Sequence, residues 1–276
     1  MDVVILNERQ KEILRRIIAT GTLEVKELLE DSKLPRSTLY NDLKLIKTLS
    51  IEQSHGKIYF STRDEFLHTH LDSRFWLYRE AKEKVAAYVA RNLIQDGDSI
   101  FLDCGSSASI LADEIVKNNI SGLSVFTNNP HALRELYYYR GINKLILIGG
   151  HVDPNDASIY GEYTSRFLRD VVDINYGKLF LGIDGVSKDG NIYIDNIYKA
   201  EQKQIMMKKA KEMYILLDES KVEKTTGRAI AQIDKQITQK GQKSIYCIIG
   251  LLSHEMPENR TKEFARSFHD NVILVP

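Results

Sequence analysis

The sequence predicts an α/β protein with two parts: a small helical N-terminal domain that ends in a β-hairpin, and a larger C-terminal domain built around a mainly parallel sheet. Three observations support this prediction. Apolar residues recur at helical spacing over roughly the first fifty residues, and two short strand-like segments follow them. From Ser99 onward, short continuously apolar runs alternate with helical stretches, which is typical of a parallel sheet covered on both faces. A length of 276 residues leaves room for one or two domains.

The composition limits the cellular compartment and the classes of partner that can be expected for this protein. The 38 Lys and Arg residues balance the 38 Asp and Glu residues, so only a local excess of charge could indicate a nucleic-acid partner. Two cysteines, Cys104 and Cys247, are too few for a disulfide framework and suit a reducing compartment. The first residues resemble no signal peptide, and no apolar segment is long enough to span a membrane. We therefore expect a cytoplasmic protein without a membrane segment.

Three helices are predicted before the hairpin. Asn7 is a candidate N-cap for the first, with Gln10 placed to reach back to it, and Gly21 ends this helix. The segment EVKELLEDS forms the second. The third begins near Pro35, and its buried stripe consists of Leu39, Leu43 and Ile46. Two short strands then flank a turn at residues 55–57.

This order of elements is that of a winged helix-turn-helix, whose recognition helix enters the major groove of DNA. Between Lys33 and Lys47 lie four basic residues and one acidic residue, Asp42, a net charge of +3 in a neutral protein. Basic side chains bind phosphates, whereas hydroxyl and amide groups can read base edges. A solvated face of a small helical domain remains the simpler alternative. The candidate DNA-binding residues are Arg36, Ser37, Thr38, Tyr40, Asn41, Lys44, Lys47, His55 and Lys57.

The second domain is predicted to be Rossmann-like. We place the DNA-binding domain at residues 1–62, a linker at 63–80 and the α/β domain at 81–276. Ligands of open parallel sheets bind beyond the carboxyl ends of the strands, and polar motifs follow five of the predicted strands. The predicted strands are 99–103, 123–127, 144–148, 178–182, 213–218, 244–250 and 271–275.

The stretch DCGSS after the first of these strands favours a phosphate cradle. A dinucleotide turn needs G-x-G-x-x-G and a P-loop needs G-x-x-x-x-G-K-[ST], and neither pattern is present. Gly105 would let the backbone approach an anion, and a helix N-terminus would supply N–H groups. Lys221 could add a positive charge. A Cys104 nucleophile, helped by His131 or His151, is a further alternative that the pattern leaves open.

The block TLEVKELLEDSKLPRSTLYNDLKLIK resembles the DNA-binding domain of DeoR-family bacterial transcription regulators. The matching positions of the family pattern are Val25, Glu27, Leu28, Ser37, Thr38, Leu39, Asp42 and Leu43. The usual Arg-Arg before Asp-Leu is Tyr40-Asn41 here, and the usual His-Gly-Gly-Ala of the wing is replaced at residues 55–58. Both departures lie on the predicted DNA-facing side, so the resemblance does not supply an operator sequence.

The resemblance extends to about residue 227. Family motifs such as D-x-G-T-T, V-x-T-N, G-x-D-G and D-x-S-K have counterparts in order at 103–107, 125–128, 182–185 and 218–221. The resemblance implies a repressor of sugar or carbohydrate metabolism genes that senses a phosphorylated sugar, uses no cofactor or metal, binds a double-stranded DNA operator and forms a homodimer or homotetramer. The implied effector-binding residues are Asp103, Gly105, Ser106, Ser107, Thr127, Asn128, Asn129, Gly149, Gly150, Gly161, Asp184, Gly185, Glu201 and Lys221.

A sugar-phosphate isomerase is the alternative, because this kind of sensor domain resembles ribose-5-phosphate isomerase in fold. Asp184 and Glu201 could supply part of the acid–base set of such an enzyme. The isomerase pattern similar to D-G-A-D-E, followed by a lysine and a run of glycines, is not reproduced: Leu181 stands where another acid would be. With a helix-turn-helix attached, we expect sensing and not turnover.

Overall fold

The computed structural model describes most of the chain, which separates into two compact units, Met1–Tyr78 and Arg79–Pro276. The described residues are 7–20, 22–32, 35–46, 51–54, 56–60, 75, 77–153, 158–170, 176–233, 245–252 and 258–276.

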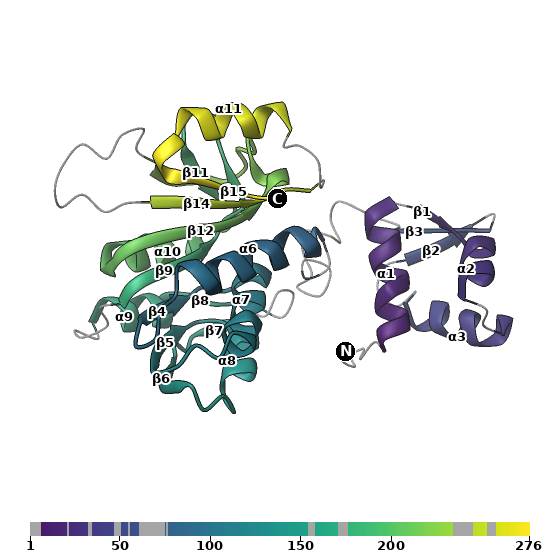
Figure 1. The fold of residues 1–276 in the computed structure, drawn as a ribbon, viewed down its shortest axis with the longest axis horizontal. Coiled ribbons are helices and arrows are strands. Elements are labelled where there is room, and N and C mark those ends of the chain that lie inside the picture. The colour runs from purple at the N-terminus through teal and green to yellow at the C-terminus, as the bar shows by residue number, and fades with distance from the viewer. Residues whose placement is uncertain are drawn as a thin grey trace. The chain divides into compact units, whose positions relative to one another are not determined.

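The described part of the N-terminal unit has three helices and a three-stranded antiparallel sheet of order β1-β3-β2 (Figure 1). The three helices and the β2–β3 pair follow the order predicted from the sequence, whereas the short strand β1 was not predicted. The elements are α1 (Glu8–Thr20), β1 (Thr22–Glu24), α2 (Val25–Ser32), α3 (Arg36–Ile46), β2 (Ile51–Ser54) and β3 (Lys57–Phe60). Their apolar residues form one core that includes Leu14, Ile17, Leu39, Leu43 and Ile58.

Asn7 and Gln10 form the capping box expected at the start of α1. The Gln10 backbone N–H donates to Asn7 Oδ1 at 3.0 Å, and the Asn7 backbone N–H donates to Gln10 Oε1 at 2.9 Å. Gln10 also donates from Nε2 to Oδ1 of the buried Asp42 on α3 at 2.8 Å, and Arg9 pairs with the other carboxylate oxygen. Asp42 therefore turns inward and joins α1 to α3, so the one acidic residue counted between Lys33 and Lys47 does not contribute to the exposed face of α3.

The C-terminal unit is built on a seven-stranded sheet in which every strand pair is parallel. The strand order is β15-β14-β12-β9-β4-β5-β6 (Figure 1). All seven apolar runs predicted from the sequence are strands of this sheet. Their bounds are β4 (Ser99–Leu102), β5 (Leu123–Thr127), β6 (Ile142–Leu147), β9 (Tyr176–Gly182), β12 (Ala210–Asp218), β14 (Ile245–Gly250) and β15 (Val272–Val275).

The sheet has a topological switch point at its centre. From β4 the chain moves outward to β5 and β6, then crosses back to β9 on the other side of β4 and continues to β12, β14 and β15. At such a point the connections leave neighbouring strands in opposite directions, and a crevice forms beyond the carboxyl ends of the two strands. Here those ends are the segments that begin at Asp103 and Ile183.

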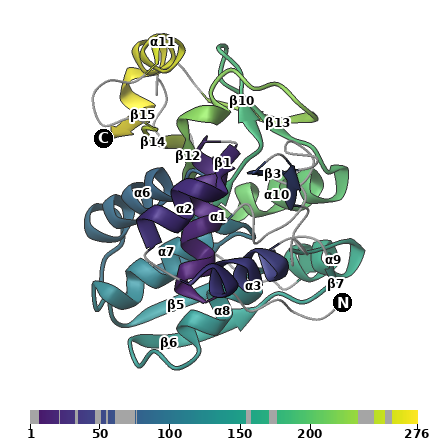
Figure 2. The ribbon, with the colours of Figure 1, turned by 90° about the vertical axis from the view of Figure 1, so that its right-hand side faces the viewer.

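Helices cover both faces of the sheet (Figure 2). The helices α6, α7 and α8 contact one another in series. α6 packs on β12, β14 and β15, and α7 packs on β4, β9 and β12, while α10 lies on the opposite face. The core on the α10 face includes Phe101, Leu179, Met206 and Ile215. The helix bounds are α6 (Arg79–Asn92), α7 (Ser106–Lys117), α8 (Pro130–Leu136), α9 (Glu162–Asp170), α10 (Ile197–Lys209) and α11 (Asn259–Ser267).

The described part of this unit also has two small antiparallel sheets and two 3₁₀ turns, which the sequence did not predict. One sheet has the order β10-β11-β13 and the other pairs β7 with β8. The bounds are β7 (His151–Val152), β8 (Ile159–Tyr160), β10 (Gly185–Val186), β11 (Asn191–Ile194), β13 (Arg228–Gln232), η2 (Glu219–Lys221) and η3 (His269–Asn271). Among the described residues, no helix is long and apolar enough to cross a membrane.

Gly250 allows α6 to lie unusually close to the sheet. A β-carbon at this position would be 2.3 Å from the carbonyl oxygen of Ala81 and 3.0 Å from a methyl group of Val85, both on α6. The backbone atom cannot move aside as a flexible side chain could. The helix that opens the C-terminal unit therefore fits the end of β14 only because residue 250 has no side chain.

Candidate functional site

The connection from β4 to α7 presents a helix N-terminus at the carboxyl edge of the sheet. Gly105 is the N-cap of α7 and has φ 121°, a backbone conformation that L side chains rarely adopt. Among the residues that the structure describes, no side chain caps this helix, and a β-carbon at Gly105 would meet no atom within 4 Å. Ser106 and Ser107 are the first two residues of the helix, and both are buried. The first turn of α7 therefore has the backbone geometry and the dipole that favour an anion.

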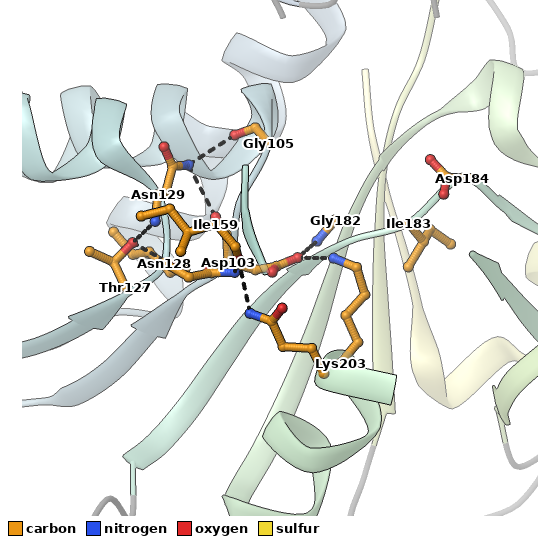
Figure 3. Close-up of polar contacts among 12 residues, drawn as sticks. Asp103, Gly105, Thr127, Asn128, Asn129, Ile159, Gly182, Ile183, Asp184 and Lys203 are labelled. Atoms are coloured by element: carbon orange, nitrogen blue, oxygen red, sulfur yellow. Dashed lines mark hydrogen bonds and ion pairs between the residues drawn. The ribbon is translucent and has the colours of Figure 1, made fainter. Parts of the chain in front are cut away.

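Asp103 lies directly beneath this turn and is completely buried. Its Oδ2 accepts a hydrogen bond from the Gly182 backbone N–H at 3.2 Å and pairs with Lys203 of α10 (Figure 3). Burial lowers the pKa of Lys203, but the negative charge of Asp103 and its hydrogen bond outweigh this effect, so the net pKa of Lys203 is raised. The Lys203 ammonium is therefore charged at neutral pH, and the pair joins β4, β9 and α10 at the switch point.

Thr127 and Asn129 hold the neighbouring loops in place. The Thr127 hydroxyl donates to the Leu102 carbonyl at 2.7 Å, which ties the end of β5 to the end of β4. Asn129 Oδ1 caps α8 by accepting from two backbone N–H groups, and its Nδ2 donates to the carbonyls of Asp103 and Gly105 at 3.1 and 3.2 Å. Both side chains are thus engaged with the protein, and they position the Asp103–Ser107 turn.

Asn128 belongs to a second buried polar group. Its Nδ2 donates to the Ile159 carbonyl of β8 at 3.2 Å, and Gln202 Nε2 of α10 donates to the same oxygen at 3.2 Å. Asn128 and Gln202 are 1% and 2% exposed. Within the described part of the chain, Asn128 Oδ1, Gln202 Oε1 and Asp103 Oδ1 are buried oxygens without a hydrogen-bond partner. Such atoms are rare in folded proteins, and three of them gather on neighbouring elements here.

The next strand end contributes Asp184, Gly185 and Lys221. Asp184 is half-buried after β9, and its Oδ2 accepts from the Asp195 backbone N–H at 3.0 Å. Lys221 Nζ donates to the Ile183 carbonyl at 2.7 Å. Gly185 is needed for close packing, because a β-carbon there would lie 2.1 Å from the Lys224 carbonyl oxygen. The structure thus brings Lys221 and Asp184 to adjacent strand ends.

The glycines after β6 are more peripheral. Gly149 and Gly150 are exposed, and the Gly149 carbonyl accepts from the Thr164 hydroxyl at 3.0 Å. A β-carbon at Gly150 would overlap that hydroxyl oxygen at 1.8 Å, so this glycine permits close packing against α9. Gly161 precedes α9 with φ 105°. All three shape the backbone around the β7–β8 hairpin.

Glu201 does not join the buried polar network. Its side chain is half exposed and pairs with Arg169 of α9 at 3.0 Å. The two residues that follow it, Gln202 and Lys203, are the ones that turn inward. The effector contact expected of Glu201 stays a prediction. One residue along a helix rotates a side chain by about 100°, so Glu201 lies on a different face of α10 from its two inward-facing neighbours.

Sequence reasoning missed Gln202 and Lys203, although a signal was present. Lys203 lies three residues after the buried Ala200 and three before the buried Met206, so helical spacing places it on the apolar face of α10. A lysine on such a face must be paired or must reach solvent. Applied to this segment, that criterion would have identified Lys203 as the partner of a buried carboxylate.

The third helix carries most of the predicted DNA-facing residues on its surface. Arg36, Ser37, Tyr40, Asn41 and Lys44 are exposed on α3, and Thr38 is half-buried. Lys57 is exposed at the start of β3 and lies 3.8 Å from Glu24. Lys47 and His55 lie outside the described residues. With Asp42 turned inward, the exposed charges of the described part of α3 are basic.

The comparisons with known proteins agree with this architecture. Residues 78–238, more than half of the chain, match the family described as "DeoR C terminal sensor domain". The chain therefore belongs to the DeoR family, and the resemblance inferred from the sequence motifs is confirmed.

Several relatives are repressors by name. The chain is 27% identical over 219 residues to the lactose phosphotransferase system repressor of Staphylococcus epidermidis, covering 79% of this chain and 84% of that protein. It is 26% identical to the transcriptional regulator IolR of Bacillus subtilis, covering 82% and 87%. It is also 26% identical to the glycerol-3-phosphate regulon repressor of Escherichia coli, covering 78% and 82%. These homologues are regulators and not enzymes.

Among solved structures, ribose 5-phosphate isomerase A from Methanocaldococcus jannaschii matches with 20% identity and a TM-score of 0.37, covering 52% of this chain and 54% of that one.

Within the residues that the structure describes, no group of three or more His, Cys, Asp or Glu side chains could hold a metal ion.

Proposed function

We propose that this protein is a DNA-binding repressor of carbohydrate metabolism genes whose C-terminal unit binds a phosphorylated sugar. The observation that carries the proposal is the uncapped N-terminus of α7, headed by Gly105, beside the buried Asp103–Lys203 pair at the switch point of the sheet. The names of the relatives, two repressors and one transcriptional regulator, support the assignment.

The phosphate of the effector would bind at the first turn of α7. Backbone N–H groups and the hydroxyls of Ser106 and Ser107 are suitable donors for phosphate oxygens. Lys221, held by the Ile183 carbonyl at the next strand end, would add a positive charge on the same edge. Thr127 and Asn129 are assigned a supporting role, because their polar atoms already bind the turn that would hold the phosphate.

The N-terminal unit would bind the operator through α3. Arg36, Lys44 and Lys57 would contact phosphates, whereas Ser37, Tyr40 and Asn41 would read base edges. We retain residues 1–62 as the DNA-binding domain, 63–80 as a linker and 81–276 as the sensor. Regulators of this kind bind repeated half-sites, so we propose a homodimer or homotetramer that acts in the cytoplasm.

Effector binding would act by shifting populations. A ligand changes DNA affinity only if it binds the DNA-competent and DNA-incompetent states with different affinity. The test is fluorescence anisotropy on DNA from directly upstream of the gene, across graded salt, with and without sugar phosphates. Saturable, sequence-preferring binding that one sugar phosphate shifts would support the proposal. Binding to no DNA at low salt would contradict it.

Ser106→Glu tests the position of the phosphate. A carboxylate at the first residue of α7 would repel the phosphate, so we expect the effector response to disappear while DNA affinity stays within about twofold. Ser121→Glu is the matched control, because Ser121 is exposed just before β5, at the opposite edge of the sheet. A Ser106→Glu variant that still responds to the effector would contradict the placement of the phosphate.

A further inference from the structure

Three buried side-chain oxygens, those of Asp103, Asn128 and Gln202, lie close together at the carboxyl edge of the sheet, because contacts link the three residues to one another. Leu102 and Thr127 are register partners on β4 and β5, so Asp103 and Asn128, which follow them, are neighbours. Asn128 and Gln202 donate to one carbonyl oxygen, that of Ile159, and Lys203, next to Gln202 on α10, pairs with Asp103. Figure 3 shows Asp103, Asn128, Ile159 and Lys203 together at this edge.

The unpartnered atoms of this set are all acceptors. They are Asp103 Oδ1, Asn128 Oδ1 and Gln202 Oε1. The orientation of the two amides is fixed, because the Ile159 carbonyl can only accept and each amide must therefore turn its NH₂ group toward it. The amide oxygens consequently face away from Ile159. Whatever satisfies these atoms has to supply hydrogen-bond donors or positive charge.

A metal ion is disfavoured at this position. Lys203 already neutralises Asp103, and Oδ2 of the carboxylate is occupied by Lys203 and by the Gly182 N–H. One neutralised carboxylate and two amide oxygens, beside a buried ammonium, form a poor site for a divalent cation, which favours uncompensated carboxylates. Hydroxyl groups fit better, because each can donate one hydrogen bond without bringing charge into a buried region.

We propose that Asp103, Asn128 and Gln202 form a hydroxyl-recognition subsite beside the phosphate cradle. The subsite makes the sensor selective for polyhydroxylated phosphate esters over inorganic phosphate and over analogues that lack a hydroxyl. This inference rests on the proposed function, since it assumes that the phosphate binds at α7. Removing an acceptor oxygen leaves a buried ligand hydroxyl unpaired, which weakens binding of the sugar phosphate but not of phosphate alone.

The test is isothermal titration calorimetry on the full chain with glucose 6-phosphate, fructose 6-phosphate, ribose 5-phosphate, glycerol 3-phosphate and inorganic phosphate. Gln202→Met keeps the length of the side chain and removes its acceptor. Thr261→Val is the matched control: Thr261 Oγ1 is another buried oxygen without a partner in the described part of the chain, but it lies on α11, which packs against the edge strand β15. Thermal unfolding verifies that both variants are folded.

We expect at least one sugar phosphate to bind wild type about tenfold or more tightly than inorganic phosphate. Gln202→Met should weaken that binding about tenfold and change the Kd of inorganic phosphate less than about twofold, whereas Thr261→Val should change neither. A further comparison uses wild type and the 2-deoxy analogue of a hexose or pentose phosphate that binds. If the 2-hydroxyl occupies the subsite, the 2-deoxy analogue should bind more weakly than the parent sugar phosphate. Asn128→Leu extends the test to the second amide and should also weaken sugar phosphate selectively.

The possible failures are distinguishable. If wild type binds a sugar phosphate and neither Gln202→Met nor Asn128→Leu changes its Kd, the proposed function stands and the subsite does not exist. Equal weakening of sugar phosphate and inorganic phosphate by Gln202→Met would show that Gln202 only supports the fold, as it would if an internal water satisfied these oxygens. If no member of the panel binds wild type better than inorganic phosphate, both the proposed function and this inference fail.

Discussion

Each unit buries an aspartate that forms an ion pair with a basic side chain. The two aspartates differ in how many of their carboxylate oxygens have a hydrogen-bond partner. In the N-terminal unit, Asp42 accepts from Arg9 and from Gln10, so both of its oxygens are bonded. In the C-terminal unit, Asp103 engages Lys203 and Gly182 through one oxygen and leaves the other without a partner in the described part of the chain. A buried acceptor left open is destabilising unless something else binds it.

The two pairs also differ in exposure and in their place in the fold, and this difference is consistent with the binding role proposed for Asp103. Arg9 is partly exposed, so the Arg9–Asp42 ion pair links α1 to α3 close to the protein surface. Lys203 and Asp103 are both almost inaccessible and sit at the switch point, where ligands bind in sheets of this kind. The protein thus pairs a buried aspartate with a basic residue in both units, with arginine in the N-terminal unit and lysine in the C-terminal unit.

Breaking the C-terminal pair should have the largest effect. Lys203→Met leaves the buried Asp103 without its counter-ion, and removal of one partner from a buried ion pair destabilises a protein by about 3–5 kcal/mol. Chemical unfolding of the full chain measures this loss. Lys208→Met, an exposed lysine on the same helix, is the control and should change stability by less than about 0.5 kcal/mol. A small effect of Lys203→Met would show that Asp103 is accessible to water.

Removing the cap of the N-terminal unit should have a smaller effect. Asn7→Ala deletes the oxygen that accepts from the Gln10 backbone N–H at 3.0 Å and should destabilise this unit by about 1 kcal/mol. Hydrogen exchange followed by mass spectrometry would locate the loss of protection in α1. If protection fell equally in α10, the two units would unfold together, and the comparison between them would no longer hold.

The two pairs should respond to opposite extremes of pH. Burial raises the pKa of Asp42, but hydrogen bonds from Arg9 and Gln10 outweigh it and the net pKa is lowered. Its contribution is therefore complete above its unfolded pKa of about 3.9 and is lost as the pH falls through the lower folded value. The raised pKa of Lys203 has the opposite consequence: its contribution is complete below about pH 10.4 and is lost as the pH rises through the folded value.

The measurement is the difference in unfolding free energy between wild type and a variant across pH. For Asp42→Asn this difference should shrink as the pH falls below about 4. For Lys203→Met it should shrink as the pH rises above about 10.4. Parallel pH profiles for the two variants would mean that the ionisations of Asp42 and Lys203 do not control the stability of either unit.

The smallest effect on stability is expected on the face of α3. Lys44 is exposed, so Lys44→Ala should change stability by less than about 0.5 kcal/mol. It should nevertheless weaken binding to all DNA sequences and reduce the slope of log Kd against log salt by about one, because one phosphate contact is lost. Lys188→Ala, in an exposed turn of the sensor unit, should leave the slope unchanged. An unaltered slope for Lys44→Ala would remove this residue from the DNA interface.

The large sheet could be predicted because its strands are buried on both faces. Continuous apolar runs such as 213–218 and 244–250 are typical of strands that are covered on both faces. All seven strands of the large sheet were predicted at the correct positions. Apart from β2 and β3, the small antiparallel strands were missed because they are only two to five residues long and carry mixed side chains. β1 is an example: its three residues follow α1 after a single residue, and only pairing with β3 defines it as a strand.

The site was predicted in part for a similar reason. Asp103 and Asn128 follow predicted strands, and the sheet rule places such residues at one edge. Gln202 and Lys203 come from a helix one hundred residues further along the chain, so their proximity depends on tertiary packing. Their neighbour Glu201 matched a family pattern more visibly, although its side chain lies on the outer face of α10.

The close contact between Gly250 and α6 limits which substitutions the sensor unit can accept. The chain enters the sensor unit through α6, immediately after Tyr78, and this helix rests on β14 where no β-carbon fits. In a saturation mutagenesis library selected for folded protein, position 250 should therefore be as intolerant as the largest core residues. Directed evolution of new effector specificities would have to keep this residue and could vary residues 128 and 202 instead.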